Sequence, residues 1–509
     1  MFSDVASTER PDIIVSKLLE GRVAILVEGS PIALYTPALF SDNFQTPDDY
    51  DTPPFYSGFI RTLRYFSFVL SIFLPGVYVA IGTFHQELIP TSMLFTVARE
   101  EITTPYSLMT EALMLLILYE IMREAGLRLP KAVGHAVSII GGIVIGETTV
   151  SAGLIGAPML VVVALTAISS YVVSSLYESV SVLRFFFILI GGLTGMYGII
   201  LAASVLCMNI CAINPYGVPY CSPISPFDKK SLADLFYRQS WIKLSKRKVR
   251  INNLRGANVD SDLAKRNKIS PISLFYILFI CRIVVSLTSV HSVSATEINS
   301  QALISFVIAM FMTVVFSLPA VFCYKMNKNP IDIKWVSKLY YVYFIFIAAV
   351  SVSRFSYFAS TTLNPETQGC LFVLIVCACA FYGTTLGIEA LSRFSALVFV
   401  LLCLAILCVL LCNYDTFNDI NFYPVITNEG KGILKSAFVF SSNTSGIALF
   451  LVLYPSVNGK CTRNFIRFIC FSFLSIFLLL YFAVAVMGES ILMRNFPLFV
   501  LSNFKIRKF

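Results

Sequence analysis

Apolar runs of about 20 residues recur along almost the whole chain, and this feature most limits what the chain can fold into. As a helix, such a run matches the roughly 30 Å thickness of the hydrocarbon core of a bilayer. Runs such as 371–382 and 394–412 are apolar on every face, which excludes a membrane β-barrel, whose strands alternate apolar and polar residues. Only 13% of residues are charged, about half the usual share in soluble domains. We therefore predict an all-α integral membrane protein.

A basic segment at 228–268 divides the chain into two membrane modules. It holds twelve Lys or Arg residues against four Asp, a net charge of +8, whereas the whole chain carries +9. Basic residues stay on the cytoplasmic side of a membrane, so we predict a cytoplasmic linker that touches anionic lipid headgroups. A nucleic-acid patch is the alternative, and so many membrane spans argue against it, so we expect no nucleic-acid partner. The predicted modules are residues 1–227 and 269–509.

The second module is predicted to contain about seven spans. Positively charged loops alternate with loops that hold the acidic residues, as expected when the linker is cytoplasmic. Seven spans leave the carboxyl end outside, and we expect this module to be truncated there. The spans are predicted near 272–290, 302–323, 339–360, 371–386, 394–412, 437–454 and 468–487.

The first module has five apolar runs, of which we predict that four cross the membrane. If the amino end and the linker both lie in the cytoplasm, the number of crossings must be even. The run 112–122 is the shortest and has charged flanks, so it is predicted to form a re-entrant or interfacial amphipathic helix. The other runs are 65–84, 133–150, 158–173 and 185–213.

Catalytic and metal-binding patterns are missing from the sequence. Most of the 13 cysteines lie within apolar runs, and the three histidines are scattered singly. No nucleophile elbow, phosphate loop or HExxH motif occurs. We expect no enzymatic activity, no cofactor and no metal site.

Glu147 is the candidate channel residue, because it lies at membrane depth within a glycine-rich stretch. Glycines allow helices to approach closely, and a ring of carboxylates from several copies of the module would favour cations. Alternatively, Glu147 ends a helix beside the loop 148–156 and is simply solvated. Both interpretations stay open at this point.

Two polar stretches within the second module are candidate ligand-binding sites, one in its first predicted span and one in its sixth. Broken helices at membrane depth expose backbone donors and acceptors that can bind a solute of amino-acid size. The alternative is that the hydroxyl groups bond back to their own helices. The candidate residues are Ser286, Ser289, Ser292, Ser442, Asn443, Thr444, Ser445 and Gly446.

Two sets of motifs distinguish the two halves of the chain. The first is ERPD at 9–12, EGRVAILVEGSP at 20–31, FHQELIP at 84–90, EIMREAGLRLP at 120–130, VVALTAI at 162–168 and GVPYCSPISP at 217–226; the second is ISP at 269–271, GIEALSR at 387–393 and NFYP at 421–424. With the first set, residues 9–240 resemble the A subunit of bacterial spore germinant receptors. With the second, the chain from 269 onward resembles the B subunit of the same receptors, a relative of the amino acid, polyamine and organocation permeases. A B subunit normally has about ten spans, so its last three are expected to be missing.

The resemblance implies a receptor component of the spore inner membrane that senses a nutrient, such as an amino acid, and couples it to ion release. It implies that A subunits assemble as a ring-shaped homo-oligomeric channel through the first module, that B subunits sense the nutrient, and that a receptor C-subunit lipoprotein is a partner. The alternatives are an amino-acid transporter of the permease superfamily and a non-functional remnant of a receptor locus.

Overall fold

The computed structural model describes residues 2–130, 142, 144–225, 235–236, 269–294, 299–326, 329–363, 368–414, 417, 419–422, 430–442, 446–488 and 501. The chain forms two compact units, Met1–Ala257 and Asn258–Phe509. Seven helices in the described part are long and apolar enough to cross a membrane, and three shorter apolar helices accompany them. The predicted helical membrane fold is confirmed. Except for residues 235–236, the basic segment lies outside the described residues, so the domain boundaries at 227 and 269 remain a prediction.

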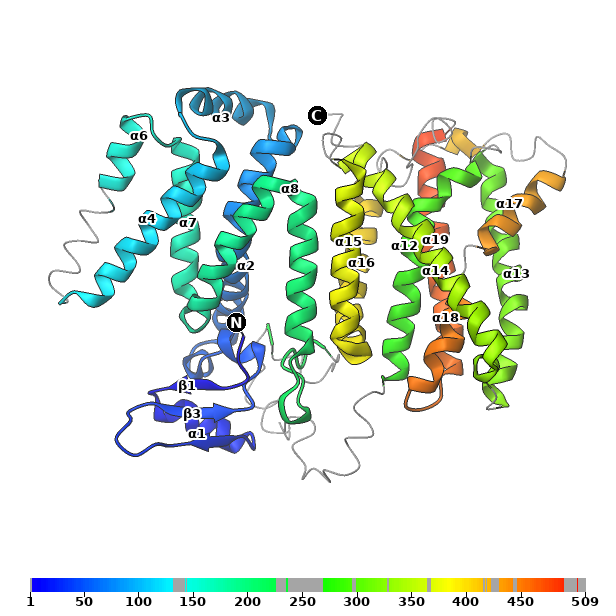
Figure 1. Ribbon diagram of the computed structural model, residues 1–509, viewed down its shortest axis with the longest axis horizontal. Coiled ribbons are helices and arrows are strands. Elements are labelled where there is room, and N and C mark those ends of the chain that lie inside the picture. The colour runs from blue at the N-terminus through cyan, green and yellow to red at the C-terminus, as the bar shows by residue number, and fades with distance from the viewer. Residues whose placement is uncertain are drawn as a thin grey trace. The chain divides into compact units, whose positions relative to one another are not determined.

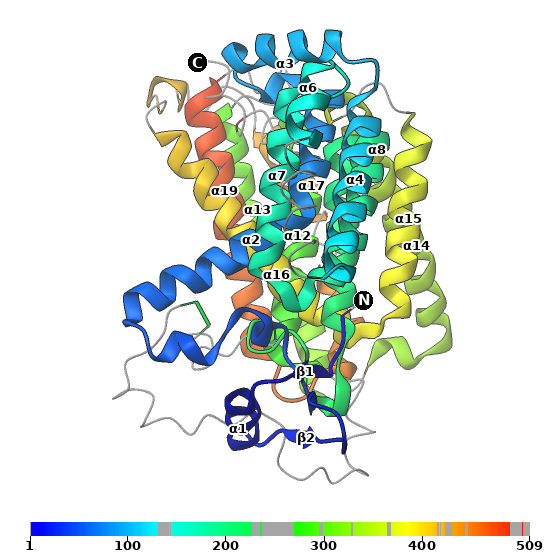
Figure 2. The same cartoon turned by 90° about the vertical axis from the view of Figure 1, so that its left-hand side faces the viewer.

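The first unit opens with a small three-stranded sheet that the sequence pattern did not predict. Its strands hold three or four residues each and pair antiparallel in the order β1-β3-β2, with Ala6 opposite Tyr35 and Val23 opposite Thr36. Figure 2 shows this sheet and α1 at one end of the helices of the first unit, and α3 at the opposite end. The elements are β1 (Ala6–Thr8), α1 (Pro11–Leu19), β2 (Val23–Ile25), β3 (Ala33–Thr36), α2 (Pro54–Phe84), α3 (Thr91–Thr103), α4 (Leu108–Arg128), η4 (Val144–Thr148), α6 (Thr149–Ser151), α7 (Ala157–Val172) and α8 (Tyr177–Ala212).

A buried carboxylate holds this sheet region together. Asp42 accepts hydrogen bonds from Lys17 at 2.9 Å and from the Nη2 of Arg22 at 3.0 Å. Burial raises the pKa of Asp42, but the charges of Lys17 and Arg22 outweigh it and lower that pKa to about 2. The carboxylate therefore stays ionised across the physiological range.

A second carboxylate fastens the sheet region to the first membrane helix. Asp49 accepts from Arg61 at 2.9 Å and from Arg64 at 2.8 Å, and both arginines lie in the first turns of α2. The exposed Arg10 reaches across to Asp48 at 2.8 Å. Arg10 of the ERPD motif at 9–12 therefore helps to hold in place the segment that precedes α2.

The end of the first unit returns to this same region. The backbone amide of Phe40 donates to the carbonyl of Tyr220 at 2.9 Å, and the two rings meet edge to face at 6.0 Å. Motifs near residues 9–31 and 217–226, far apart in sequence, thus belong to one packed substructure.

Helices α2 and α8 pack closely because glycines line their contact. A Cβ atom on Gly76 would lie 2.7 Å from the backbone oxygen of Phe187, and one on Gly191 would lie 2.5 Å from the backbone oxygen of Gly76. Any larger side chain at these positions would force the helices apart. This contact forms the centre of the first unit.

Helix α8 folds back on itself at Gly195, whose φ of 69° is open to glycine but strained for other residues. The Cβ position of Gly191 lies 3.2 Å from the Cδ1 of Ile199, although eight residues of straight helix would separate them by about 12 Å. Figure 1 shows the two arms of α8 running in opposite directions. The run 185–213, interpreted from sequence as one span, therefore contains a reversal.

Helix α4 contains the short run 112–122 and lies against α2, α7 and α8. Its first turn lies beside Gly82 near the end of α2, and near its other end Glu120 accepts from Tyr177 at 2.9 Å. Helix α4 is not among the helices apolar enough to cross a membrane in the described part. Most of the run 133–150 lies outside the described residues, so the count of four spans stays a prediction.

The second unit is a bundle in which each of the seven predicted runs lies largely on one described helix or, for the run 437–454, on the two helices α17 and α18. The backbone of Ile269, just before α12, donates to Ser456 at 2.8 Å, so α12 begins at the end of the bundle where α18 finishes (Figure 1). Its helices are α12 (Pro271–Ser294), α13 (Asn299–Lys325), α14 (Lys334–Phe358), α15 (Gly369–Thr385), α16 (Gly387–Cys412), α17 (Gly430–Ser442), α18 (Gly446–Leu453) and α19 (Thr462–Met487).

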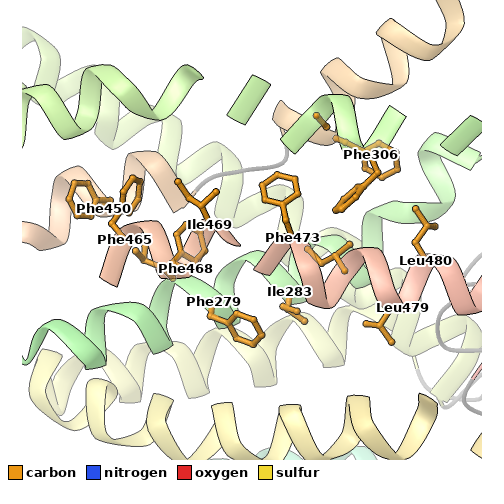
Figure 3. Packing of buried hydrophobic residues seen from close by; sticks show 14 of the residues in the cluster. Phe279, Ile283, Phe306, Phe450, Phe465, Phe468, Ile469, Phe473, Leu479 and Leu480 are labelled. Carbon is orange, nitrogen blue, oxygen red and sulfur yellow. The ribbon is translucent and has the colours of Figure 1, made fainter. Parts of the chain in front are cut away.

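The apolar core of the second unit is centred on α19. Figure 3 shows Phe465, Phe468 and Phe473 of this helix packing among side chains from other helices, including Phe279 of α12 and Phe450 of α18. These side chains are fully or almost fully buried. The core therefore joins α12, α13 and α18 to one central helix.

Candidate functional site

The sixth predicted span of the second unit is covered by two described helices, α17, which ends at Ser442, and α18, which begins at Gly446. Asn443, Thr444 and Ser445 lie outside the described residues, so a broken helix at this point stays a prediction.

Gly446 packs directly against an aromatic ring. A Cβ atom at this position would lie 2.7 Å from the Cζ of Phe468. Phe468 in turn contacts Phe465 at 5.9 Å, and Phe465 contacts Phe450 at 4.1 Å between ring centres (Figure 3). Close packing alone therefore accounts for a glycine here, whether or not it contacts a ligand.

Among the candidate serines of α12, the side chain of Ser286 is described, and it bonds back to its own helix as the alternative interpretation expected. The hydroxyl of the buried Ser286 donates to the carbonyl of Arg282, one turn earlier, at 2.9 Å. Ser289 and Ser292 lie further along the same helix, and Ser442 ends α17; the orientations of these three side chains are outside the described part of the structure. Ligand binding by this set stays a prediction.

A buried arginine in the same helix is the feature that the serine pattern overlooked. Arg282 is 1% exposed, and its Nε and Nη1 have no hydrogen-bond partner among the described residues. Its guanidinium lies over the ring of Phe473, 4.6 Å from the ring centre. Placing an arginine at the centre of a membrane helix costs roughly 2.5–3.5 kcal/mol, so such a residue calls for a functional explanation. The signal was visible in sequence, as a single charge inside the run 272–290.

Aromatic contacts connect Arg282 to the end of α17. Phe473 contacts Phe306 of α13 at 5.3 Å between ring centres, and Phe306 contacts Phe440 of α17 at the same separation. Phe440 lies two residues before the end of α17. Ser305, next to Phe306, is fully buried, and its hydroxyl has no hydrogen-bond partner among the described residues. The described core near the end of α17 therefore contains two side chains, Arg282 and Ser305, with polar atoms that have no hydrogen-bond partner among the described residues.

In the first unit, Glu147 is exposed within the short η4 segment. Helix α6 follows this segment directly, so Glu147 does not end a helix as the alternative interpretation expected. Both the channel role and the solvated alternative stay predictions. Glu111 of α4 is another buried acid of this unit, only 2% exposed, and it accepts a hydrogen bond from the backbone amide of Gly156. Glu111 thereby fixes α4 to the start of α7.

Within the described ranges, no group of three or more His, Cys, Asp or Glu residues could hold a metal ion. The lack of a cofactor and of enzymatic activity stays an expectation from the sequence.

Comparison with known proteins identifies both units. Residues 1–250 match the family described as Bacillus/Clostridium GerA spore germination protein, and residues 268–504 match the spore permease family described as spore germination protein. No solved structure is significantly similar to the chain.

Curated relatives match about half of the chain. The chain is 42% identical to spore germination protein KA of Bacillus subtilis over 242 residues, 47% of this chain and 44% of that protein. It is 36% identical to spore germination protein B1 of the same organism over 252 residues, 49% of this chain and 52% of that protein. An uncharacterised membrane protein, YfkQ of Bacillus subtilis, is 38% identical over 53% of each chain. The chain spans about half the length of these relatives.

These matches agree with the apolar helices of both units and with the expected location in the spore inner membrane. The chain is an integral membrane protein of the germination receptor family, in which a GerA-family domain at residues 1–250 is followed by a spore permease domain at residues 268–504.

Proposed function

We propose that the chain is a component of a spore germinant receptor. In this proposal the permease-like unit senses a nutrient, such as an amino acid, and the GerA-family unit couples that signal to ion release across the spore inner membrane. The observation that carries the proposal is the presence in one chain of domains from two families of spore germination proteins.

The polar stretch in the sixth predicted span supports nutrient sensing by the second unit, because α17 ends at Ser442 and α18 begins at the buried Gly446 within an otherwise apolar segment. A polar group in an apolar setting gains free energy by binding a polar solute. Coupling then requires that the nutrient binds one conformation of the chain more tightly than another. We further propose that several copies assemble through the first unit, with Glu147 on the ion path, and that a C-subunit lipoprotein joins the complex.

Two measurements test this function. Deleting the gene and recording germination on a panel of nutrients should remove or delay the response to at least one of them, and restoring the gene should restore it. An unchanged response to every nutrient would favour a non-functional remnant. Uptake of labelled amino acid into sealed vesicles separates the receptor from a transporter, because sustained accumulation would assign transport to the permease unit.

A further inference from the structure

Among the described residues of the second unit, Arg282 has the most buried polar atoms without a hydrogen-bond partner. Its guanidinium is a permanent cation with five N–H donors, and two of its nitrogens have no hydrogen-bond partner among the described residues. The described acidic residues of this unit lie in segments at helix ends: Asp332 in η7 (Pro330–Asp332), Glu389 in the first turn of α16, where it pairs with Arg393, and Asp419 in η10 (Asp419–Phe422). The core of the unit therefore holds a cation and supplies it mainly with an aromatic face.

The surroundings restrict what can complete this site. Phe279 and Ile283 flank Arg282 in the chain, and both are fully buried in the apolar core (Figure 3). The hydroxyl of Ser286 already donates to a backbone carbonyl. The face of Phe473 holds the guanidinium plane in place but provides no hydrogen-bond acceptor. An anion with two oxygen acceptors would supply the hydrogen bonds that the described residues do not.

We propose that Arg282 binds the carboxylate group of the nutrient. This inference rests on the proposed sensing function and deepens it, because it limits the nutrient to small molecules with a free carboxylate, such as α-amino acids. A guanidinium can donate two parallel hydrogen bonds to a carboxylate, which gives both strength and selectivity.

The test compares acids with their amides. The purified full chain in lipid nanodiscs is titrated with the twenty common L-amino acids and with their primary amides, and binding is measured by calorimetry. The wild-type chain should bind at least one acid about tenfold or more tightly than its amide. Arg282→Gln should lose this preference, while Arg282→Lys, which keeps the charge but not the planar fork, should retain part of it.

Two controls separate ligand recognition from structural support. Arg467→Gln changes an exposed arginine at the start of α19, which donates to Asn464, and should leave the preference intact. Arg282→Met removes a buried charge without an anionic partner, so the ligand-free variant should melt at the same temperature as the wild-type chain or higher.

Two outcomes would contradict the role of Arg282 without affecting the proposed sensing function. One is a clear acid preference that survives in Arg282→Gln, and the other is a large fall in the melting temperature of Arg282→Met. If the wild-type chain binds none of the acids or amides, the inference and amino-acid sensing fail together. Tight binding of amides and acids alike keeps the sensing function and rejects the role of Arg282.

Discussion

The guanidinium of Arg282 lies 4.6 Å from the ring centre of Phe473, and both side chains are buried in the apolar core of the permease-like unit. This pair places a permanent cation next to the aromatic contacts that lead to Phe440 near the end of α17. A cation in an apolar core is retained at a cost in free energy.

Replacing Asp42 by Asn should destabilise the sheet region of the first unit. Lys17 and Arg22 would lose the carboxylate that neutralises them, and breaking a buried ion pair from one side costs roughly 3–5 kcal/mol. Limited proteolysis of the region before α2 measures this loss. Asp12→Asn is the matched control, because Asp12 is exposed and pairs with Arg10 at the surface; equal protease sensitivity of the two variants would contradict the prediction.

Protonation of Asp42 should lower the stability of this region at acidic pH. The pKa of Asp42 is lowered from 3.8 to about 2 in the folded chain. Its contribution to stability is therefore present above the unfolded value and is lost as the pH falls from about 4 to 2, a loss of roughly 2 kcal/mol. Proteolysis with an acid-active protease across this range should show progressive opening in the wild-type chain and a flatter response in Asp42→Asn. A wild-type profile of protease sensitivity as flat as that of the variant would contradict a stabilising role for the ionised Asp42.

Gly446→Ala should destabilise the second unit through a steric contact. The added Cβ would lie 2.7 Å from the ring of Phe468, and crowding of this kind in a packed core costs roughly 1–3 kcal/mol. The melting temperature of the full chain should fall, and Phe468→Leu in the same chain should recover part of the loss. A nutrient response that is restored along with stability assigns Gly446 to packing; a response still absent from the stable double variant assigns it to ligand binding.

Glu111 should stabilise the contact between α4 and α7. Its carboxylate accepts the backbone amide of Gly156, and leaving a buried donor without a partner costs roughly 1–3 kcal/mol. Glu111→Ala is expected to melt several degrees below the wild-type chain, and Glu111→Gln, which keeps an oxygen acceptor, by less. Identical melting of the two variants would show that this hydrogen bond is unimportant.

Glu147→Gln should lower cation release without changing the melting temperature, since Glu147 is exposed. One unit charge at about 4 Å is worth about 1 kcal/mol in water, so the rate should fall by about fivefold if a cation passes close to it. The rate is measured as nutrient-triggered cation release from spores that carry the variant. Glu178→Gln, another exposed acid of the same unit, is the control. The same rate in both variants would reject a channel role for Glu147.

The length of the apolar runs predicted most of the helical fold, because a helix that crosses a bilayer needs about 20 apolar residues whatever its neighbours are. The reversal of α8 was not predicted, since Gly195 lies among other glycines and only its positive φ distinguishes it. The sheet was missed because strands of three or four residues carry too little pattern to be recognised.

The candidate site was predicted only in part. The sequence indicated a polar stretch around Ser442 and Gly446, because hydroxyl and glycine residues are conspicuous inside an apolar run. It also contained Arg282, but a sequence does not show whether neighbouring helices provide a charged side chain with partners. That information comes from tertiary packing, in which Ser286 bonds to its own helix while two nitrogens of Arg282 have no hydrogen-bond partner among the described residues.

Nutrient-triggered cation release from spores tests the proposed receptor function most directly. Wild-type spores, spores without the gene and spores with the gene restored are each exposed to the same panel of nutrients, and cations in the medium are followed over time. We predict that at least one nutrient triggers release in wild-type and restored spores and that the response is absent or clearly slower without the gene. Identical release from all three kinds of spore for every nutrient would contradict a receptor function for this chain.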